Sequence, residues 1–233
     1  MRAADAHGKH LFLGFAPTDD ARPGHWLHVH LGLYGGWELQ RHGPHDAPAP
    51  PRGAVRVRLL GDTVTADLRG PTACDVLNPA EKRAVHARLG ADPLRPRSDP
   101  EQAWRAISRS RAPVGGLLMQ QEVVAGVGNV YRAEVLFRAR LDPFRSGREV
   151  TYEQWQGIWA DLVTLMRAGV RAGNIVTTLP EHRARRTGSA RREDRFYVYK
   201  RTGLPCRLCG TPVVAEPFVA RTLYYCPTCQ PAA

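Results

Sequence analysis

Four of the five cysteines form two Cys-x-x-Cys pairs near the end of the chain, and sixteen residues separate the pairs: Cys206, Cys209, Cys226 and Cys229. Each pair places two thiolates on one side of a tight turn, so the two pairs supply four sulfur ligands for a tetrahedral Zn²⁺. Four thiolates leave no open coordination position, and the expected role of one zinc ion is therefore structural. A redox-active dithiol or a chance arrangement is the alternative.

The residues between the two pairs, 211–225, carry the apolar pattern of a two-strand hairpin. The fifth cysteine, Cys74, lies far from the others along the chain and is expected to be a small buried apolar residue.

A second segment, residues 119–131, joins two helix-like stretches through Gly126-Val127-Gly128-Asn129. Gly126 is suited to the left-handed conformation at the end of a helix. Backbone N–H groups in such a turn, beside the N-terminus of the next helix, form a phosphate site. Asn129 is suited both to cap that helix and to donate its amide to a phosphate. Taken alone, the segment favours the simpler interpretation of a helical hairpin with a glycine turn.

The charge of the chain agrees with a polyanionic partner. Its formal net charge is +11 and its pI is near 10.0, and only three of its 33 basic residues are lysines. The alternative cause of the many arginines is a genomic base composition that favours arginine codons. No apolar run approaches the roughly 20 residues of a membrane helix, and the first residues lack the layout of a secretion signal.

The secondary structure that must position these groups is expected to change from strands to helices along the chain. Glycine turns separate five strand-like stretches, and several helix-like stretches follow Pro71, two of them with Asn78 and Asp99 as expected N-caps before proline. The expected strands are 10–15, 26–31, 37–40, 55–60 and 63–68, and the expected helices are 79–89, 100–108, 117–125, 130–140 and 152–172. An arginine-rich loop or linker is expected at 182–195.

Residues 121–137 resemble the helix–two-turns–helix of the formamidopyrimidine-DNA glycosylase and endonuclease VIII family. Residues 206–230 resemble the zinc finger of that family, and residues 8–11 and 28–35 resemble blocks of its N-terminal β-sandwich. These blocks occur in the family's order and cover nearly the whole chain. The resemblance implies an α+β fold with an incomplete β-sandwich lobe at 1–72, a helical DNA-binding domain at 73–195 and a zinc finger at 196–233.

The resemblance also implies roles for five residues. Lys9 corresponds to the lysine near the lesion phosphate that is associated with β-elimination. Asn129 and Arg221 correspond to the residues that bind the lesion phosphates. Lys9 and Arg221 are the expected catalytic residues. Leu33 corresponds to a side chain that fills the gap left by a flipped base, with a core strand position as the alternative. Arg69 corresponds to a further arginine in contact with the DNA.

The family's proteins begin with a proline amine, exposed after removal of Met, that attacks the deoxyribose, and with a glutamate that assists the proton transfer. This chain begins Met1-Arg2-Ala3-Ala4, so neither role transfers to one of its residues. A truncated gene model is the expected cause, and a truncated paralogue is the alternative. The chain as written is expected to form no covalent intermediate.

The function implied is that of a base-excision-repair DNA glycosylase with AP lyase activity, which flips a damaged base out of double-stranded DNA. The residues Leu33-Tyr34-Gly35 favour the endonuclease VIII branch, which prefers oxidised pyrimidines. The expected protein is a monomer without a membrane partner, cytoplasmic and associated with the nucleoid. A non-catalytic binder of damaged DNA is the alternative. A zinc-ribbon transcription or RNA-binding module would leave Gly126 to Asn129 unexplained.

Overall fold

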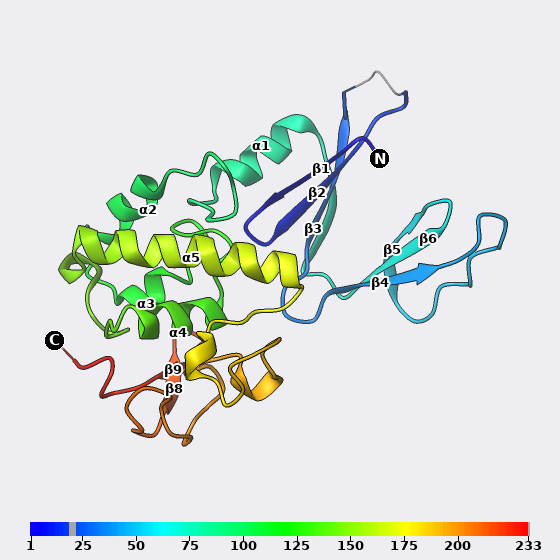
Figure 1. Ribbon diagram of the computed structural model, residues 1–233. Coiled ribbons are helices and arrows are strands. Elements are labelled where there is room, and N and C mark those ends of the chain that lie inside the picture. The colour runs from blue at the N-terminus through cyan, green and yellow to red at the C-terminus, as the bar shows by residue number, and fades with distance from the viewer. Residues whose placement is uncertain (19–21, 233) are drawn as a thin grey trace. The chain divides into compact units, whose positions relative to one another are not determined.

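The computed structural model describes residues 1–18 and 22–232 and divides into two compact units, Met1–Arg88 and Leu89–Ala233. The first unit is mostly sheet, and the second carries helices followed by a small hairpin (Figure 1). This arrangement confirms the α+β class, whereas the domain bounds 1–72, 73–195 and 196–233 stay a prediction. No helix among the described residues has the length and apolar character needed to cross a membrane.

The first sheet of the first unit has four antiparallel strands in the order β1-β2-β3-β7. They are β1 (Ala3–His7), β2 (His10–Phe15), β3 (His25–His30) and β7 (Ala73–Leu77). The sequence pattern predicted β2 and β3 but not β1 or β7. The sequences of β1 and β7 are short and mix apolar with polar residues, and these segments form strands because they pair with neighbouring strands. Cys74 lies in β7 and packs against the apolar core of this unit, but it is only partly buried, so the prediction of a buried apolar residue is confirmed in part.

The second sheet has three antiparallel strands, and β6 lies between its two neighbours. They are β4 (Gly36–Arg41), β5 (Val55–Leu60) and β6 (Val64–Arg69). Both sheets contribute to one apolar core, formed by Leu13, Leu27, Val29 and Leu68. Burial of these side chains supplies the main attraction between the sheets, at roughly 2 kcal/mol for each fully buried aliphatic side chain.

Helix α1 (Pro79–Ala87) follows the first sheet in the same unit. Asn78 caps it as predicted: its side chain accepts from the N–H groups of Ala80 and Glu81, and the Glu81 carboxylate accepts from the Asn78 N–H. Lys82 anchors the helix on the sheet, because its Nζ lies 2.8 Å from the Asp5 carboxylate and 3.8 Å from the centre of the Trp26 ring.

Several histidine rings stack on this sheet. His10 Nδ1 lies 2.8 Å from His28 Nε2, and the His10 ring centre lies 4.7 Å from that of His30. Burial, followed by the neighbouring charges of His30, His28, His7 and Arg88, lowers the pKa of His10 to about 4. The folded first unit therefore resists protonation at His10.

Mild acid is expected to destabilise the first unit. A histidine whose folded pKa lies below its ordinary value near 6.5 adds stability that is fully present above pH 6.5 and lost as the pH falls toward 4, because the unfolded chain binds the proton more tightly. The melting temperature should fall by about 5 °C or more between pH 7 and pH 5. Thermal melts of the parent and of His10→Phe test this, with exposed His25→Phe as control. An equal fall in all three proteins would contradict it.

The helices of the second unit enclose its main core. They are α2 (Pro100–Ile107), the short α3 (Val114–Leu117), α4 (Asn129–Arg138) and α5 (Tyr152–Ala172), with a 3-10 turn at Gly147–Glu149. Asp99 caps α2 as predicted, and Thr151 caps α5, whose bounds equal those predicted. The largest side chain of this core is Trp155, which is 1% exposed.

The predicted helix at 117–125 is wrong. Helix α3 ends at Leu117, and residues 118–128 form turns. The side chain of Gln121 holds these turns, because its amide donates to the carbonyl oxygens of Met119 and Val127 and its oxygen accepts from the N–H of Gly126. The N–H of Ala125 donates to Ala91 rather than to a carbonyl one turn earlier, so the segment satisfies its backbone groups without forming a helix.

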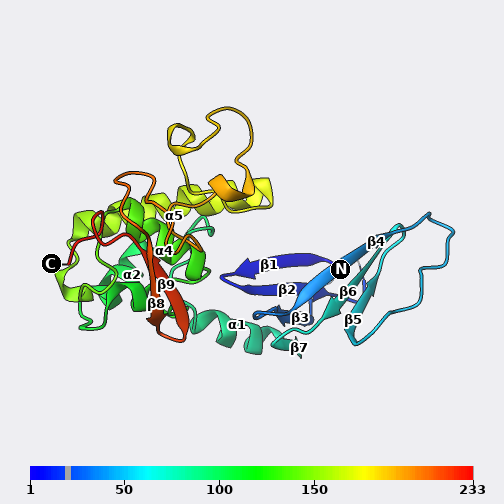
Figure 2. The same ribbon diagram turned by 90° about the horizontal axis from the view of Figure 1, so that it is seen from below.

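The rest of the second unit follows α5. It holds 3-10 turns at Pro180–His182 and Arg192–Asp194 and the hairpin of β8 (Val214–Phe218) and β9 (Arg221–Tyr225). The arginine-rich stretch 182–195 is anchored rather than an open linker, since the guanidinium of Arg207 lies 3.2 Å from buried Asp194 and donates to the Glu193 carbonyl. The helices and the hairpin pack on each other through α4, which contacts both α5 and β9 (Figure 2).

Candidate zinc centre and nucleic-acid interface

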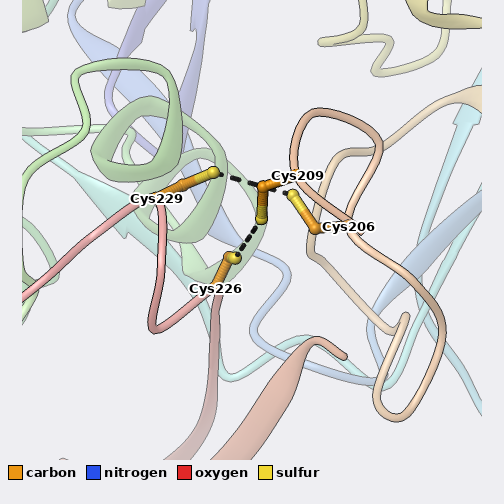
Figure 3. Close-up of side chains that lie close together, drawn as sticks. All are labelled: Cys206, Cys209, Cys226 and Cys229. Carbon is orange, nitrogen blue, oxygen red and sulfur yellow. Dashed lines mark hydrogen bonds between the residues drawn. The ribbon is translucent and has the colours of Figure 1, made fainter. Parts of the chain in front are cut away.

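The four cysteine sulfurs converge on one point beside the hairpin (Figure 3). The Sγ atoms of Cys206 and Cys229 are 3.8 Å apart, those of Cys209 and Cys226 are 3.5 Å apart, and all four lie within 4.8 Å of one another. Zn–S bonds of about 2.3 Å in a tetrahedron place the sulfurs roughly 3.8 Å apart. The residues present therefore fit one Zn²⁺, with no place for a further ligand.

The finger is fixed to helix α4 by an apolar cluster, and one amide ties it to the chain that follows this helix. The cluster joins Ala133 and Phe137 of α4 to Val213 and to the buried cysteines. Gln230 is 2% exposed, donates to the Leu141 carbonyl and accepts from the N–H of Cys226. No periodicity in the sequence indicated Gln230, although it directly follows the last zinc ligand.

The turn before α4 has the conformations that its glycines permit. Gly126 has the positive φ that was predicted, +89°, but it lies in a turn and does not end a helix, and Gly128 is the N-cap of α4. Asn129 does not cap the helix, which corrects that expectation. Instead its amide Nδ2 donates to the carbonyl oxygen of Thr222, 2.8 Å away on β9, and its oxygen accepts from the Arg132 guanidinium. The start of α4 is thereby tied to the zinc hairpin.

Arg221 is the first residue of β9 and its side chain is exposed. It follows a two-residue hairpin turn, Val219-Ala220, in which both residues are left-handed with φ of +46° and +55°. A β-branched residue such as Val219 adopts this region only under strain. Arg221 and Asn129 are thus brought together through Thr222, although they lie 92 positions apart in the sequence.

Glu134 is fully buried in α4 and accepts four hydrogen bonds. Its oxygens accept from the N–H groups of Tyr197, Val198 and Tyr199, at 2.8–2.9 Å, and from the hydroxyl of Thr177. Burial raises the pKa of Glu134, and the donated hydrogen bonds oppose that effect. The carboxylate fixes the chain that leads into the zinc finger.

Two of the predicted site residues of the first unit lie in exposed turns. Lys9 follows Gly8, whose φ is +58°, in the β1–β2 turn. Its charge also contributes to lowering the pKa of His30, after burial. Leu33 lies in the β3–β4 turn and is 66% exposed, so the alternative of a core strand position is wrong. Tyr34 beside it is 92% exposed.

Arg69, at the end of β6, is bound within the second sheet. Its guanidinium pairs with Glu38 on β4, and its Nε and Nη2 donate to the Arg52 carbonyl at 3.1 and 2.7 Å. The buried carboxylate of Asp67 lies 3.6 Å from Arg69 Nη2. All three guanidinium nitrogens of Arg69 therefore have partners in the second sheet or in the loop before β5.

Two family models match the second unit. The formamidopyrimidine-DNA glycosylase H2TH domain matches residues 89–181, and the zinc finger found in FPG and IleRS matches residues 203–232. The first range contains Gln121, Asn129 and Glu134, and the second contains the four cysteines and Arg221. Both predicted blocks are therefore confirmed.

Several relatives match nearly the whole chain. Endonuclease 8 1 of Mycobacterium tuberculosis is 45% identical over 232 residues, covering 99% of this chain and 84% of that protein. Formamidopyrimidine-DNA glycosylase of Thermus thermophilus is 34% identical over 209 residues, covering 88% and 74%. The crystal structure of the Fpg protein from that organism superposes with a TM-score of 0.75 at 30% identity, covering 97% of this chain and 81% of that one. The chain therefore belongs to the formamidopyrimidine-DNA glycosylase and endonuclease VIII family of base-excision-repair DNA glycosylases and AP lyases.

Proposed function

We propose that this protein binds damaged double-stranded DNA through a phosphate site formed by Asn129 and Arg221. The observation that carries the proposal is the hydrogen bond from the Asn129 amide to the Thr222 carbonyl, which ties one predicted phosphate ligand to the residue directly after the other, Arg221. The N-terminus of α4 adds the partial positive charge of its helix dipole. A guanidinium and an amide at such an end are suited to bind the oxygens of a phosphate.

Lys9 and Leu33 complete the proposal in the first unit. An exposed ammonium at a turn is suited to hold a phosphate and to move a proton during β-elimination. An exposed apolar side chain beside an exposed tyrosine is suited to occupy the gap that a flipped base leaves in the stack. Arg69 pairs with Glu38 within the second sheet, and its contact with DNA would require release from Glu38.

Oxidised pyrimidines are the substrate class that we propose. The support is the similarity to Endonuclease 8 1 together with the Leu33-Tyr34-Gly35 turn. A structure of Lactococcus lactis Fpg in complex with abasic-site DNA shares the fold, with a TM-score of 0.76 at 18% identity. We further propose that the protein acts as a monomer, in the cytoplasm and in association with the nucleoid.

Binding to an abasic-site duplex is expected to fall steeply with salt, because each neutralised phosphate releases counterions. Arg221→Ala should weaken binding by roughly 1–3 kcal/mol and lower the salt slope by about one. Asn129→Ala should weaken binding without changing the slope, because it removes no charge. Fluorescence anisotropy of a labelled duplex at several salt concentrations measures both quantities.

The control for the lost charge is Arg167→Ala, since Arg167 is exposed on α5 and helix α4 lies between α5 and the hairpin. We expect that variant to bind like the parent. A shallow salt slope in the parent, or an Arg221→Ala variant that binds as the parent does, would contradict the proposed phosphate site.

A further inference from the structure

Arg132 is a fully buried arginine in the first turns of α4, with an exposed fraction of 0%. In the part of the chain that the structure describes, its Nε and Nη1 atoms have no hydrogen-bond partner, and no carboxylate pairs with it. Buried guanidinium groups are normally paired, because a buried charge without a partner loses its hydration and gains no interaction in return. A buried cation that lacks partners on two nitrogens requires an explanation.

The third nitrogen of Arg132 joins the two parts of the proposed phosphate site. Its Nη2 donates to the side-chain oxygen of Asn129 and lies 3.3 Å from the Thr222 carbonyl oxygen, which also accepts from the Asn129 amide. The hydrogen bond to the Asn129 oxygen fixes which end of that amide carries the donors. Nδ2 has two hydrogens and Thr222 accepts one of them, so the second remains for a ligand.

A second guanidinium group, that of Arg221, acts on Arg132. Burial, followed by the charge of Arg221, lowers the pKa of Arg132 to about 10. The aromatic ring of Phe218, 5.6 Å from the guanidinium carbon, is a weak partner at that distance. The charge of Arg221 therefore acts on Arg132 at the start of α4, where no carboxylate among the described residues pairs with Arg132, and an anion placed there would stabilise the charged form of Arg132.

We propose that Arg132 is a positioning residue for the DNA phosphate, one that orients the Asn129 amide, ties it to β9 and adds a buried positive charge to the site. This inference rests on the proposed phosphate site. It adds to that site a buried residue that acts through Asn129 and does not itself need to be exposed. A buried charge is screened less by salt than an exposed one, so its contribution to phosphate affinity should persist at high salt.

The test uses the zinc-loaded protein and a duplex with a tetrahydrofuran abasic-site analogue. Arg132→Met removes the charge and keeps much of the side-chain volume, and it should weaken binding about tenfold or more. Arg132→Lys keeps the charge and loses the geometry, so it should restore part of that affinity. Arg138→Met is the matched control, because Arg138 lies on the same helix but binds Asp161 and the Thr177 carbonyl.

A double-mutant cycle separates positioning from folding. If Arg132 acts through Asn129, then Arg132→Met should weaken binding much less in the Asn129→Ala background than in the parent. Full additivity, or equal loss of affinity in Arg132→Met and Arg138→Met, would show a merely structural role and overturn the inference. A different result, a shallow salt dependence of DNA binding by the parent protein, would contradict the proposed phosphate site itself.

Discussion

Removal of zinc is expected to unfold the β8–β9 hairpin and to abolish binding to abasic-site DNA. Few apolar side chains of the finger are fully buried apart from its cysteines, and three of those cysteines belong to the cluster that packs on α4. In zinc-finger peptides, metal binding supplies roughly 10–16 kcal/mol of folding free energy. The helical core around Trp155 is a separate cluster and should keep most of its helix signal.

Elemental analysis and chelator titration followed by circular dichroism and DNA binding measure this effect. We expect one zinc ion per chain in the parent, and we expect Cys226→Ser to lose it. Cys74→Ser is the control, because Cys74 lies outside the cluster of four. Metal-free protein that retains the hairpin and binds abasic-site DNA as tightly as the parent would contradict the assignment.

Glu134→Ala is expected to be the most damaging substitution in the helical domain. It leaves the N–H groups of Tyr197, Val198 and Tyr199 buried without their acceptor. Each buried donor without a partner costs about 1–3 kcal/mol, so the free energy of unfolding should fall by about 4 kcal/mol or more. Urea unfolding measures that loss, and hydrogen exchange at these three amides should locate it.

The controls for Glu134 separate the loss of hydrogen bonds from the loss of a charge. Glu153→Ala removes an exposed carboxylate from the first turn of α5 and should change stability by less than about 0.5 kcal/mol. Glu134→Gln keeps the shape but replaces one acceptor oxygen with a donor, so it should also be strongly destabilising. Unchanged urea midpoints in both Glu134 variants would show that the amide contacts do not hold this segment.

The sequence alone determined the features that depend on near neighbours. The zinc ligands follow from the spacing of four cysteines, because a tight turn is enough to bring each pair together. The starts of α1 and α2 follow from Asn78 and Asp99, whose side chains bind amides two or three residues away. Helix α5 follows from a long periodic pattern between a threonine cap and Gly173, whose φ is +65°.

Tertiary structure decided the features that depend on residues far apart in the sequence. The stretch 118–128 has helical spacing but forms turns, because Ala91 and the side chain of Gln121 take the hydrogen bonds that a helix would need. Strand β1 exists because β2 pairs with it, since its own sequence has little preference for a strand.

The same reason explains why the sequence did not indicate the partners of the site residues. Arg132 and Glu134 stand on a helix where a basic and an acidic residue ordinarily face solvent. Only the approach of Thr222 and of residues 197–199, which lie 63–90 positions away, makes them buried parts of one site. Local spacing fixes which atoms a turn or a helix presents, whereas long-range packing decides which of those atoms meet.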